Sequence, residues 1–210
     1  MARYTGPVCK LCRAEGVKLF LKGERCTTSK CSITRREYRP GRNAQFRVKN
    51  SEYAVRLRAK QLARRFYGVG EKQFSTYYAK AAGHKGVTGE QLLRLLELRL
   101  DNVVVRLGLA GSRPQSRQMV KHGHFMVERN GVNRRVDIPS FVVRPGDVIT
   151  IAEGSKEFVK RVVSAGVAAR VPTWLTTDAD TLTGKVLATP ARTDIDSPVN
   201  EQYIVEYYSR

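Results

Sequence analysis

Apolar residues recur at helical spacing in three stretches of the first half of the chain. Residues 51–68 ("SEYAVRLRAKQLARRFYG") begin at a candidate capping serine and end at a glycine, and residues 71–82 ("EKQFSTYYAKAA") repeat the same kind of amphipathic pattern. Thr88 and Gln91 have the spacing of a capping box, and they precede the leucine-dense residues 92–100. We therefore expect three helices, of which the third is buried at the centre of the fold.

The second half of the chain mixes one more helix with shorter, strand-like runs. A helix is predicted after Ser112, which can cap it, with Pro114 in its first turn and Gly123 as the residue that can end it. Residues 125–139 ("FMVERNGVNRRVDIP") read as a strand, an Asn130-Gly131 turn and a second strand, and "VVRPGDVITI" as a turn that enters a third strand. The tail has β-rich runs at residues 185–189 and 202–208, which predict a strand pair that docks beside the helical lobe. This pattern predicts an α+β fold.

A chain of 210 residues lies between one and two domains in length. Residues 1–50 carry all the cysteines, are rich in Gly and Arg, and lack apolar periodicity, so we expect a basic N-terminal extension. Residues 51–97 are expected to form a helical lobe, completed by a helical and β-strand segment over residues 162–210. Residues 98–161 are expected to form an inserted unit of helices on a small antiparallel sheet.

The net charge of +19 indicates a polyanionic partner, because such an excess of positive charge repels itself unless a polyanion neutralises it. Residues 1–97 hold 22 basic and 7 acidic side chains, whereas residues 162–210 hold 4 and 6. A merely solubilising surface would mix the two signs. The basic segments also lack the broad Trp/Phe/Leu face of a membrane-surface helix, and no apolar run approaches the ~18 residues of a membrane span. Nucleic acid is the favoured partner.

Four cysteines lie within one short segment at C-x2-C-x13-C-x4-C spacing: Cys9, Cys12, Cys26 and Cys31. Two close pairs across a loop can wrap four thiolates around one structural zinc ion, which would supply folding energy to a segment without a core. We therefore predict one structural zinc ion as the cofactor. Disulfides, an iron-sulfur cluster and free thiols remain alternatives at this point, since the second pair has x4 rather than x2 spacing.

The opening residues "MARYTGPVCK" lack the apolar segment of a secretory signal, so we expect an unexported, intracellular protein. The sequence contains no phosphate loop, nucleophile elbow, paired carboxylates or dinucleotide fingerprint, and "YGVGEKQF" offers only a lone G-x-G. We expect no enzymatic activity and no small-molecule substrate.

Residues 112–124 ("SRPQSRQMVKHGH") are dense in donors and positive charge. On a helix, Arg113, Arg117 and Lys121 recur at i, i+4 and i+8, which predicts a basic stripe along one face with Met119 and Val120 behind it. Hydroxyls, amides and guanidinium groups together suit phosphate and shape recognition of folded RNA. The candidate RNA contacts in this segment are Ser112, Arg113, Gln115, Ser116, Arg117, Lys121, His122 and His124.

A second group of cations surrounds the cysteines and the first long helix. Each one alone is an ordinary solvated side chain, but as a group they suit phosphate contacts to a folded RNA. The candidate RNA contacts of this group are Lys10, Arg13, Lys22, Arg35, Arg36, Arg39, Arg56, Arg58, Arg64 and Arg65, with Lys18, Arg25, Lys30 and Arg42 nearby.

The segments "RLDNVVVRLGLAGSRPQSRQMVKHGHFMV" and "VDIPSFVVRPGDVI" closely resemble the alpha-L RNA-binding module named after the fourth protein of the small ribosomal subunit. "PVCKLCRAEGVKLFLKGERC", "YAVRLRAKQLARRFYGVGEKQF", "KGVTGEQLLRLLELRLDNVV" and "PVNEQYIVEYYSR" resemble the bacterial form of that ribosomal family. The resemblance covers essentially the whole chain, and residues 98–161 correspond to the module. One departure is "VERNGVNRRVD", which is longer than the family's usual hairpin.

The resemblance implies a cytoplasmic, structural constituent of the small ribosomal subunit that binds the 5′ domain of its rRNA, nucleates assembly and contributes to translational accuracy. It implies contacts with neighbouring small-subunit proteins and a position near the path by which mRNA enters the ribosome. It also implies that Cys9, Cys12, Cys26 and Cys31 ligate zinc, as in those members that keep the metal, and that residues 113–124 face RNA.

Two other functional classes are weighed against this one. An RNA-modifying enzyme can carry the same module as an appendage, but it needs a catalytic domain that the remaining residues do not provide. A zinc-containing nucleic-acid-binding regulator would use the helix after Ser112 as a recognition helix, yet the first cysteine pair is not followed by the histidines of a finger. Competition between duplex DNA and structured RNA would separate these classes.

Overall fold

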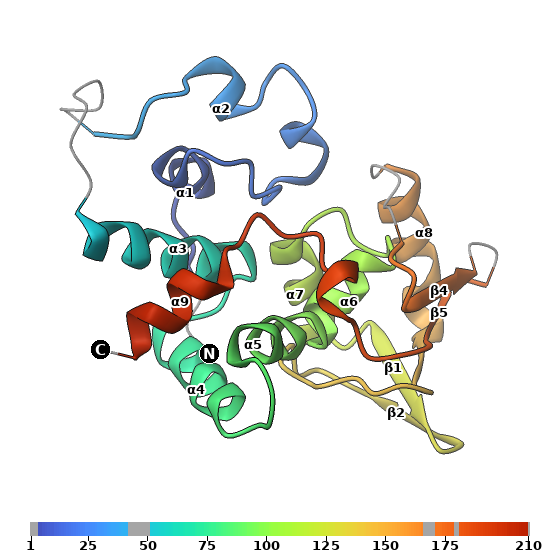
Figure 1. The fold of residues 1–210 in the computed structure, drawn as a ribbon. Coiled ribbons are helices and arrows are strands. Elements are labelled where there is room, and N and C mark those ends of the chain that lie inside the picture. Colours follow the sequence, from blue (N-terminus) through green and yellow to red (C-terminus); the bar gives the residue numbers. More distant parts are fainter. Residues whose placement is uncertain (1–3, 42–50, 166–170, 179–180, 210) are drawn as a thin grey trace. The chain divides into compact units, whose positions relative to one another are not determined.

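The computed structural model describes residues 4–41, 51–165, 171–178 and 181–209. Arg42, one of the cations near the cysteines, the end of the expected N-terminal extension (residues 43–50) and parts of the 162–210 segment lie outside these ranges. The chain divides into two compact units, residues 1–93 with 197–210 and residues 94–196. Helices and a small antiparallel sheet together make the fold α+β, as the sequence predicted (Figure 1).

The first unit is helical. Its N-terminal part holds α1 (Val8–Glu15), a 3-10 turn at Gly23–Cys26 and the short α2 (Ser32–Arg35). The longer helices α3 (Glu52–Phe66) and α4 (Glu71–Ala82) follow, and α9 (Glu201–Tyr208) lies along α3 (Figure 1). The Ser51 side chain accepts a hydrogen bond from the Ala54 amide, which confirms the predicted cap of α3.

The C-terminal residues 202–208 were predicted as a strand from their Ile, Val and Tyr content, and that prediction was wrong. They form α9, because the Asn200 side chain caps the helix by accepting from the Gln202 amide and Glu201 stands in the first turn. Ile204 is fully buried on one face of α9. The free energy gained by burying this face outweighs the preference of the residues for a strand.

The second unit begins inside α5 (Thr88–Glu97) and continues through α6 (Leu100–Arg106) and α7 (Arg113–Lys121). Its strands are β1 (Phe125–Arg129), β2 (Val132–Arg135), β3 (Val148–Ile151), β4 (Leu175–Asp178) and β5 (Thr183–Val186). They form one antiparallel sheet in the order β2-β1-β3-β5-β4. Between β3 and β4 lie a 3-10 turn (Glu153–Ser155) and α8 (Lys156–Ser164), and a last turn spans Arg192–Asp194.

One hydrophobic core holds the second unit together. Alternate residues of β1 and β3 point inward, with Phe125 opposite Ile151 and Val127 opposite Ile149, and all four are buried. Val103 and Val104 of α6 and Met119 and Val120 of α7 belong to the same cluster. The sheet therefore supports α6 and α7, and α7 carries most of the RNA contacts predicted within residues 112–124.

The structure divides the tail differently from the expected boundaries. Residues 162–196 belong to the second unit rather than the helical lobe, because β5 pairs with the edge of β3 that β1 leaves open. Pairing that edge satisfies a row of backbone N–H and C=O groups that would otherwise stay exposed. Of the expected completing segment, residues 197–209 lie in the helical unit.

Candidate nucleic-acid interface and cysteine cluster

The helix α7 forms where the sequence predicted it, with Pro114 in its first turn and the left-handed Gly123 (φ 70°) after its end. Ser112 occupies the N-cap position, but within the described residues its side chain makes no capping hydrogen bond. The Gln115 side chain instead accepts from the Gly111 amide at 3.1 Å. Ser112 and Gln115, both predicted RNA contacts, thus shape the entry into the helix.

Arg117 and Ser116 of α7 are directed onto α6. Arg117 donates to the Asp101 carboxylate at 3.0 Å, and the Ser116 hydroxyl donates to the Asp101 backbone carbonyl at 2.5 Å. The same carboxylate accepts two hydrogen bonds from Arg99, at 2.7 and 3.0 Å, and the Arg99 side chain is fully buried. Asp101 is therefore the junction through which α7 is fixed to α6.

A second set of hydrogen-bonded polar side chains links α7 to α6. Arg113 donates to the Asn102 side-chain oxygen at 2.9 Å, and the Asn102 amide donates to the buried Glu97 carboxylate at 2.5 Å. Arg106 completes this set by donating two hydrogen bonds to the Glu97 carboxylate, at 2.8 and 3.1 Å. Two members of the predicted basic stripe, Arg113 and Arg117, thus take part in an internal network.

Lys121 is the member of the stripe that is exposed, together with His122 at the end of α7. His124 is half-buried, and its Nδ1 lies 2.8 Å from the Ser155 hydroxyl. Burial, together with the nearby His122 and Arg135, lowers the pKa of His124, so the ring is neutral at pH 7. Arg135 donates to the backbone carbonyls of His122 and Gly123 at 3.1 and 2.8 Å, which places a cation at this end of α7.

The arginines of α3 are also paired internally. Arg56 donates to Glu206 of α9 at 2.7 Å and to Glu52 at 3.0 Å, and Arg64 lies 3.4 Å from Glu71. Arg65 and Arg58 both contact Glu15 of α1. Burial raises the pKa of the Glu15 carboxyl, against the opposing effect of these arginines. These four arginines of α3, which were predicted to contact RNA, therefore also stabilise the first unit through ion pairs.

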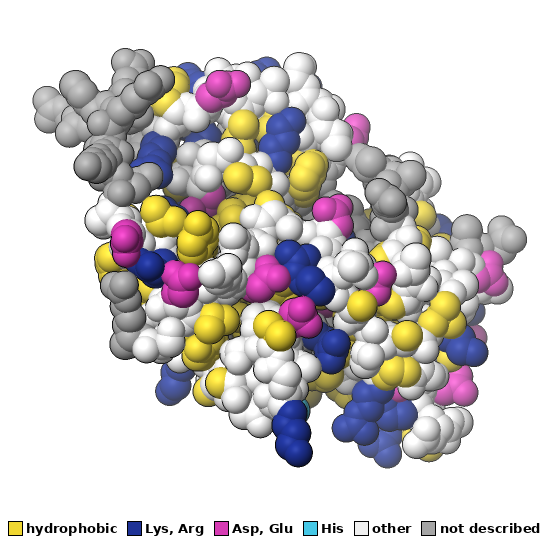
Figure 2. Space-filling model, viewed as in Figure 1, with side chains coloured by type: hydrophobic (Ala, Val, Ile, Leu, Met, Phe, Trp, Pro, Cys, Tyr) yellow, Lys and Arg dark blue, Asp and Glu magenta, His cyan; other side chains and the backbone are white. Residues whose placement is uncertain are grey.

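The cations near the cysteines are more open to solvent. Lys10, Lys22, Arg35, Arg36 and Arg39 are exposed. Arg13 is half-buried, donates to the Tyr38 carbonyl at 3.0 Å and has its guanidinium carbon 5.0 Å from the centre of the Tyr38 ring. On the face shown in Figure 2, acidic side chains lie beside basic ones at several places.

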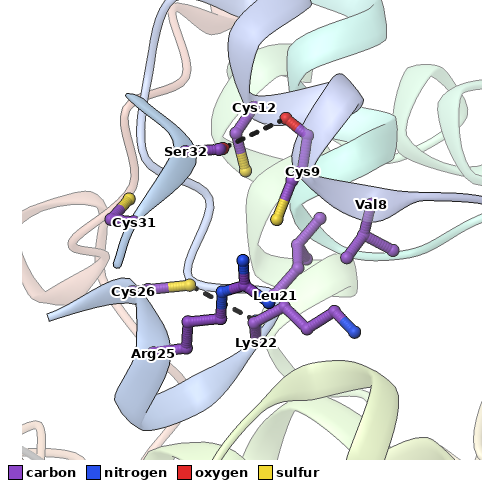
Figure 3. Close-up of a pocket in the computed structure, with 9 residues that line it drawn as sticks. All are labelled: Val8, Cys9, Cys12, Leu21, Lys22, Arg25, Cys26, Cys31 and Ser32. Atoms are coloured by element: carbon purple, nitrogen blue, oxygen red, sulfur yellow. Dashed lines mark hydrogen bonds between the residues drawn. The ribbon is translucent and has the colours of Figure 1, made fainter. Parts of the chain in front are cut away.

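Cys9, Cys12, Cys26 and Cys31 line one small pocket, and all four are free thiols (Figure 3). The first two come from α1, the third from the 3-10 turn at residues 23–26 and the last from the N-cap of α2. The fold thus brings together the four residues that the spacing singled out. In the parts of the chain that the structure describes, however, no three His, Cys, Asp or Glu side chains are arranged to hold a metal ion.

The electrostatic setting differs among these thiols. Burial raises the pKa of Cys12 and of Cys26, and the neighbouring cysteines raise both further. At Cys31 burial also raises the pKa, but the backbone amides of Ile33 and Thr34, together with Lys18 and the Thr34 side chain, outweigh burial and lower the pKa overall. The Lys22 amide also donates to the Cys26 sulfur at 3.4 Å. Backbone N–H groups directed at sulfur favour the thiolate, the form that binds metals.

Glu97, Asp101 and Asn102 were not predicted as partners of the basic residues of α7. All three are buried, and they lie in the leucine-dense run and at the start of the helix that follows it. A signal was present, because acidic and amide side chains in an otherwise apolar run require polar partners. Their partners lie up to 16 residues away, a pairing that single-sequence periodicity does not reveal.

None of the helices in the described residues is long and apolar enough to cross a membrane. Residues 3–97 match a family model described as "Ribosomal protein S4/S9 N-terminal domain", and residues 98–149 match one described as "S4 domain". The whole chain is 57% identical over 213 residues to a small ribosomal subunit protein uS4 of Desulfitobacterium hafniense. It is 56% identical over 212 residues to the uS4 of Pelotomaculum thermopropionicum and 57% over 210 to that of Gloeobacter violaceus, with full coverage of each pair.

Proposed function

The chain belongs to the ribosomal protein S4 family, and we infer that it is a structural, non-enzymatic constituent of the small ribosomal subunit that binds ribosomal RNA in the cytoplasm. The observation that carries this function is identity of more than half of all residues to uS4 proteins over their full length. The net charge of +19 supports it physically, since RNA supplies the compensating charge. An RNA-modifying enzyme and a regulator are not supported.

At finer detail, we propose that the chain binds the 5′ domain of the small-subunit rRNA, nucleates assembly there and contributes to translational accuracy. Internal networks hold α7 before RNA arrives, so little conformational entropy remains to be lost on binding. The exposed cations Lys121, Arg36 and Arg39 would contact phosphates and release counterions. The other predicted RNA contacts are proposed both to stabilise the fold and to bind RNA.

The same proposal includes neighbouring small-subunit proteins as partners and a position near the path by which mRNA enters. The name of the relatives, small ribosomal subunit protein, supports protein neighbours, because that subunit contains other ribosomal proteins.

The test is competitive binding of the purified protein to 5′-domain rRNA transcript, tRNA and duplex DNA across a salt series. We expect a preference for the rRNA that persists at high salt while binding to the other two falls steeply. Equal affinities that disappear together would reduce the protein to a nonspecific polyanion binder and overturn the proposed target.

We also propose that Cys9, Cys12, Cys26 and Cys31 hold one structural zinc ion. Two facts support this: the four thiols line a single pocket, and backbone amides are directed at the sulfurs of Cys26 and Cys31. Zinc would be bound by thiolates alone, and it would stabilise the fold of the N-terminal part without an open coordination position for catalysis. Metal analysis of protein purified without chelator tests the proposal, with one zinc per chain expected and none in a C9S/C12S variant.

A further inference from the structure

A row of aromatic rings is exposed where α7 ends and α8 begins. The His124 ring lies 5.2 Å from the Phe158 ring, centre to centre, at an interplanar angle of 33°. The His122 ring lies 6.0 Å from the His124 ring at 60°. Phe158 is 40% exposed and His122 is exposed, so the row presents aromatic surface to solvent.

Packing and hydrogen bonds within the second unit hold the Phe158 and His124 rings in place. Val159, the next residue of α8, is fully buried in the core of the second unit, which turns Phe158 outward. The His124 ring is fixed by its 2.8 Å hydrogen bond with Ser155, and the Ala152 amide donates to the His124 carbonyl at 3.0 Å. A rigid, exposed aromatic group loses little entropy when another flat ring stacks on it.

The surroundings of this row are cationic. Arg135 is held against the backbone of His122 and Gly123, and the exposed Lys121 directly precedes His122 at the end of α7. Two carboxylates, Glu153 and Glu157, are also exposed nearby along the chain, and Glu153 lies 3.8 Å from Lys156. The balance of charge favours a polyanion over an acidic or neutral protein surface.

From these observations we propose that His122, His124 and Phe158 form a stacking platform for an unpaired base of the bound RNA, flanked by phosphate contacts from Arg135 and Lys121. Aromatic side chains beside cations are the common means by which proteins hold splayed-out bases. The neutral state of His124 at pH 7 suits stacking, because an uncharged ring is less costly to desolvate. The platform rests on the proposed function and adds a class of contact to it.

The central experiment compares Phe158→Ala with the unchanged protein in binding to the 5′-domain transcript across a salt series. Loss of one base stack is expected to weaken binding by between about five-fold and about a hundredfold. The slope of log K against log salt should stay unchanged, because no phosphate contact is lost. Phe158→Tyr, which keeps the ring, should bind like the unchanged protein.

Leu187→Ala is the matched control, since Leu187 is an exposed apolar residue of the same unit (50%) outside the ring row. It should leave the affinity unaltered. Thermal unfolding of each variant verifies that the second unit remains folded. Should Phe158→Ala unfold, photocrosslinking of the unchanged protein to 4-thiouridine-substituted RNA decides instead, with crosslinks expected on the peptides that carry His122, His124 or Phe158.

Unchanged affinity of Phe158→Ala, or bound RNA without crosslinks at these peptides, would overturn the platform. Unchanged RNA affinity combined with poorer incorporation of other proteins in a reconstituted subunit would assign the rings to a protein neighbour, which also overturns it. Failure of the platform differs from failure of the proposed function. In the latter case the unchanged protein itself would show no preference for the rRNA.

Discussion

Arg117 of α7 reaches the Asp101 carboxylate of α6 at 3.0 Å, with only 13% of the arginine side chain and 6% of the aspartate side chain exposed. A cation on a helix expected to face RNA is thus directed into its own protein. Because the same carboxylate also holds the fully buried Arg99, Asp101 fixes the position of α7 on the core. The orientation of the helix is set before any RNA binds.

Asp101→Asn should therefore lower stability by about 3–5 kcal/mol, the usual cost of removing one partner from a buried ion pair. Urea unfolding measures this change. The variant should also bind rRNA more weakly, although it gains one unit of positive charge, because α7 loses its anchor. Asp137→Asn, with the same charge change at an exposed site, should be stable and bind at least as well. Stronger RNA binding by Asp101→Asn would show that charge alone governs the interface.

Lys121→Ala tests the exposed end of the stripe. Since Lys121 is exposed on α7, its replacement should remove about one phosphate contact and reduce the salt slope of rRNA binding by about 0.9. Stability should hardly change. Lys185→Ala removes an exposed lysine from β5 and serves as the control. Equal slopes for the two variants would mean that Lys121 does not contact phosphate.

Much of this arrangement was accessible from the sequence because local signals decided it. The helix after Ser112, with Pro114 in its first turn and Gly123 after its end, follows from local preferences, and so does the Asn130-Gly131 hairpin. The clustering of the cysteines followed from their spacing. Each of these depends on residues close together in the chain.

What the sequence did not reveal depends on distant partners. Nothing local shows that Arg113 will contact Asn102, or that Arg65 will contact Glu15. The strand-like composition of residues 202–208 was misleading because burial of Ile204 against the first unit favours a helix there. Tertiary packing overrides local propensity at such sites.

Chelation should act on the first unit only. If zinc is held by the four cysteines, its removal should expose residues 4–41 to protease while the core around Phe125 and Ile149 keeps its protection. Limited proteolysis with mass spectrometry, with and without chelator, measures this. Adding back zinc should restore protection, and a C26S/C31S variant should be insensitive to chelator. An unaltered digestion pattern after chelation would count against the metal.

Acidification should destabilise the second unit through His124. The pKa of His124 is lowered in the folded protein, so the unfolded chain takes up a proton first as the pH falls. The stability contributed by the neutral ring is complete above the unfolded pKa of about 6.5 and is lost as the pH falls from there toward the folded value. Unfolding free energies at pH 7.5 and pH 5 should differ less in His124→Gln than in the unchanged protein.

Gly184 shows why the tail belongs to the second unit. It stands opposite Ile149 of β3, and a Cβ built there would lie 2.3 Å from the Leu107 Cδ1 atom. A residue without a side chain lets β5 approach the Leu107 side chain, at the C-cap of α6, so closely. Gly184→Ala should thus cost about 1–3 kcal/mol in urea unfolding, as overpacked cores do. Gly154→Ala, where a Cβ meets nothing within 4 Å, should cost far less. Equal costs would mean that Leu107 moves aside freely and that β5 is held by its strand pairing alone.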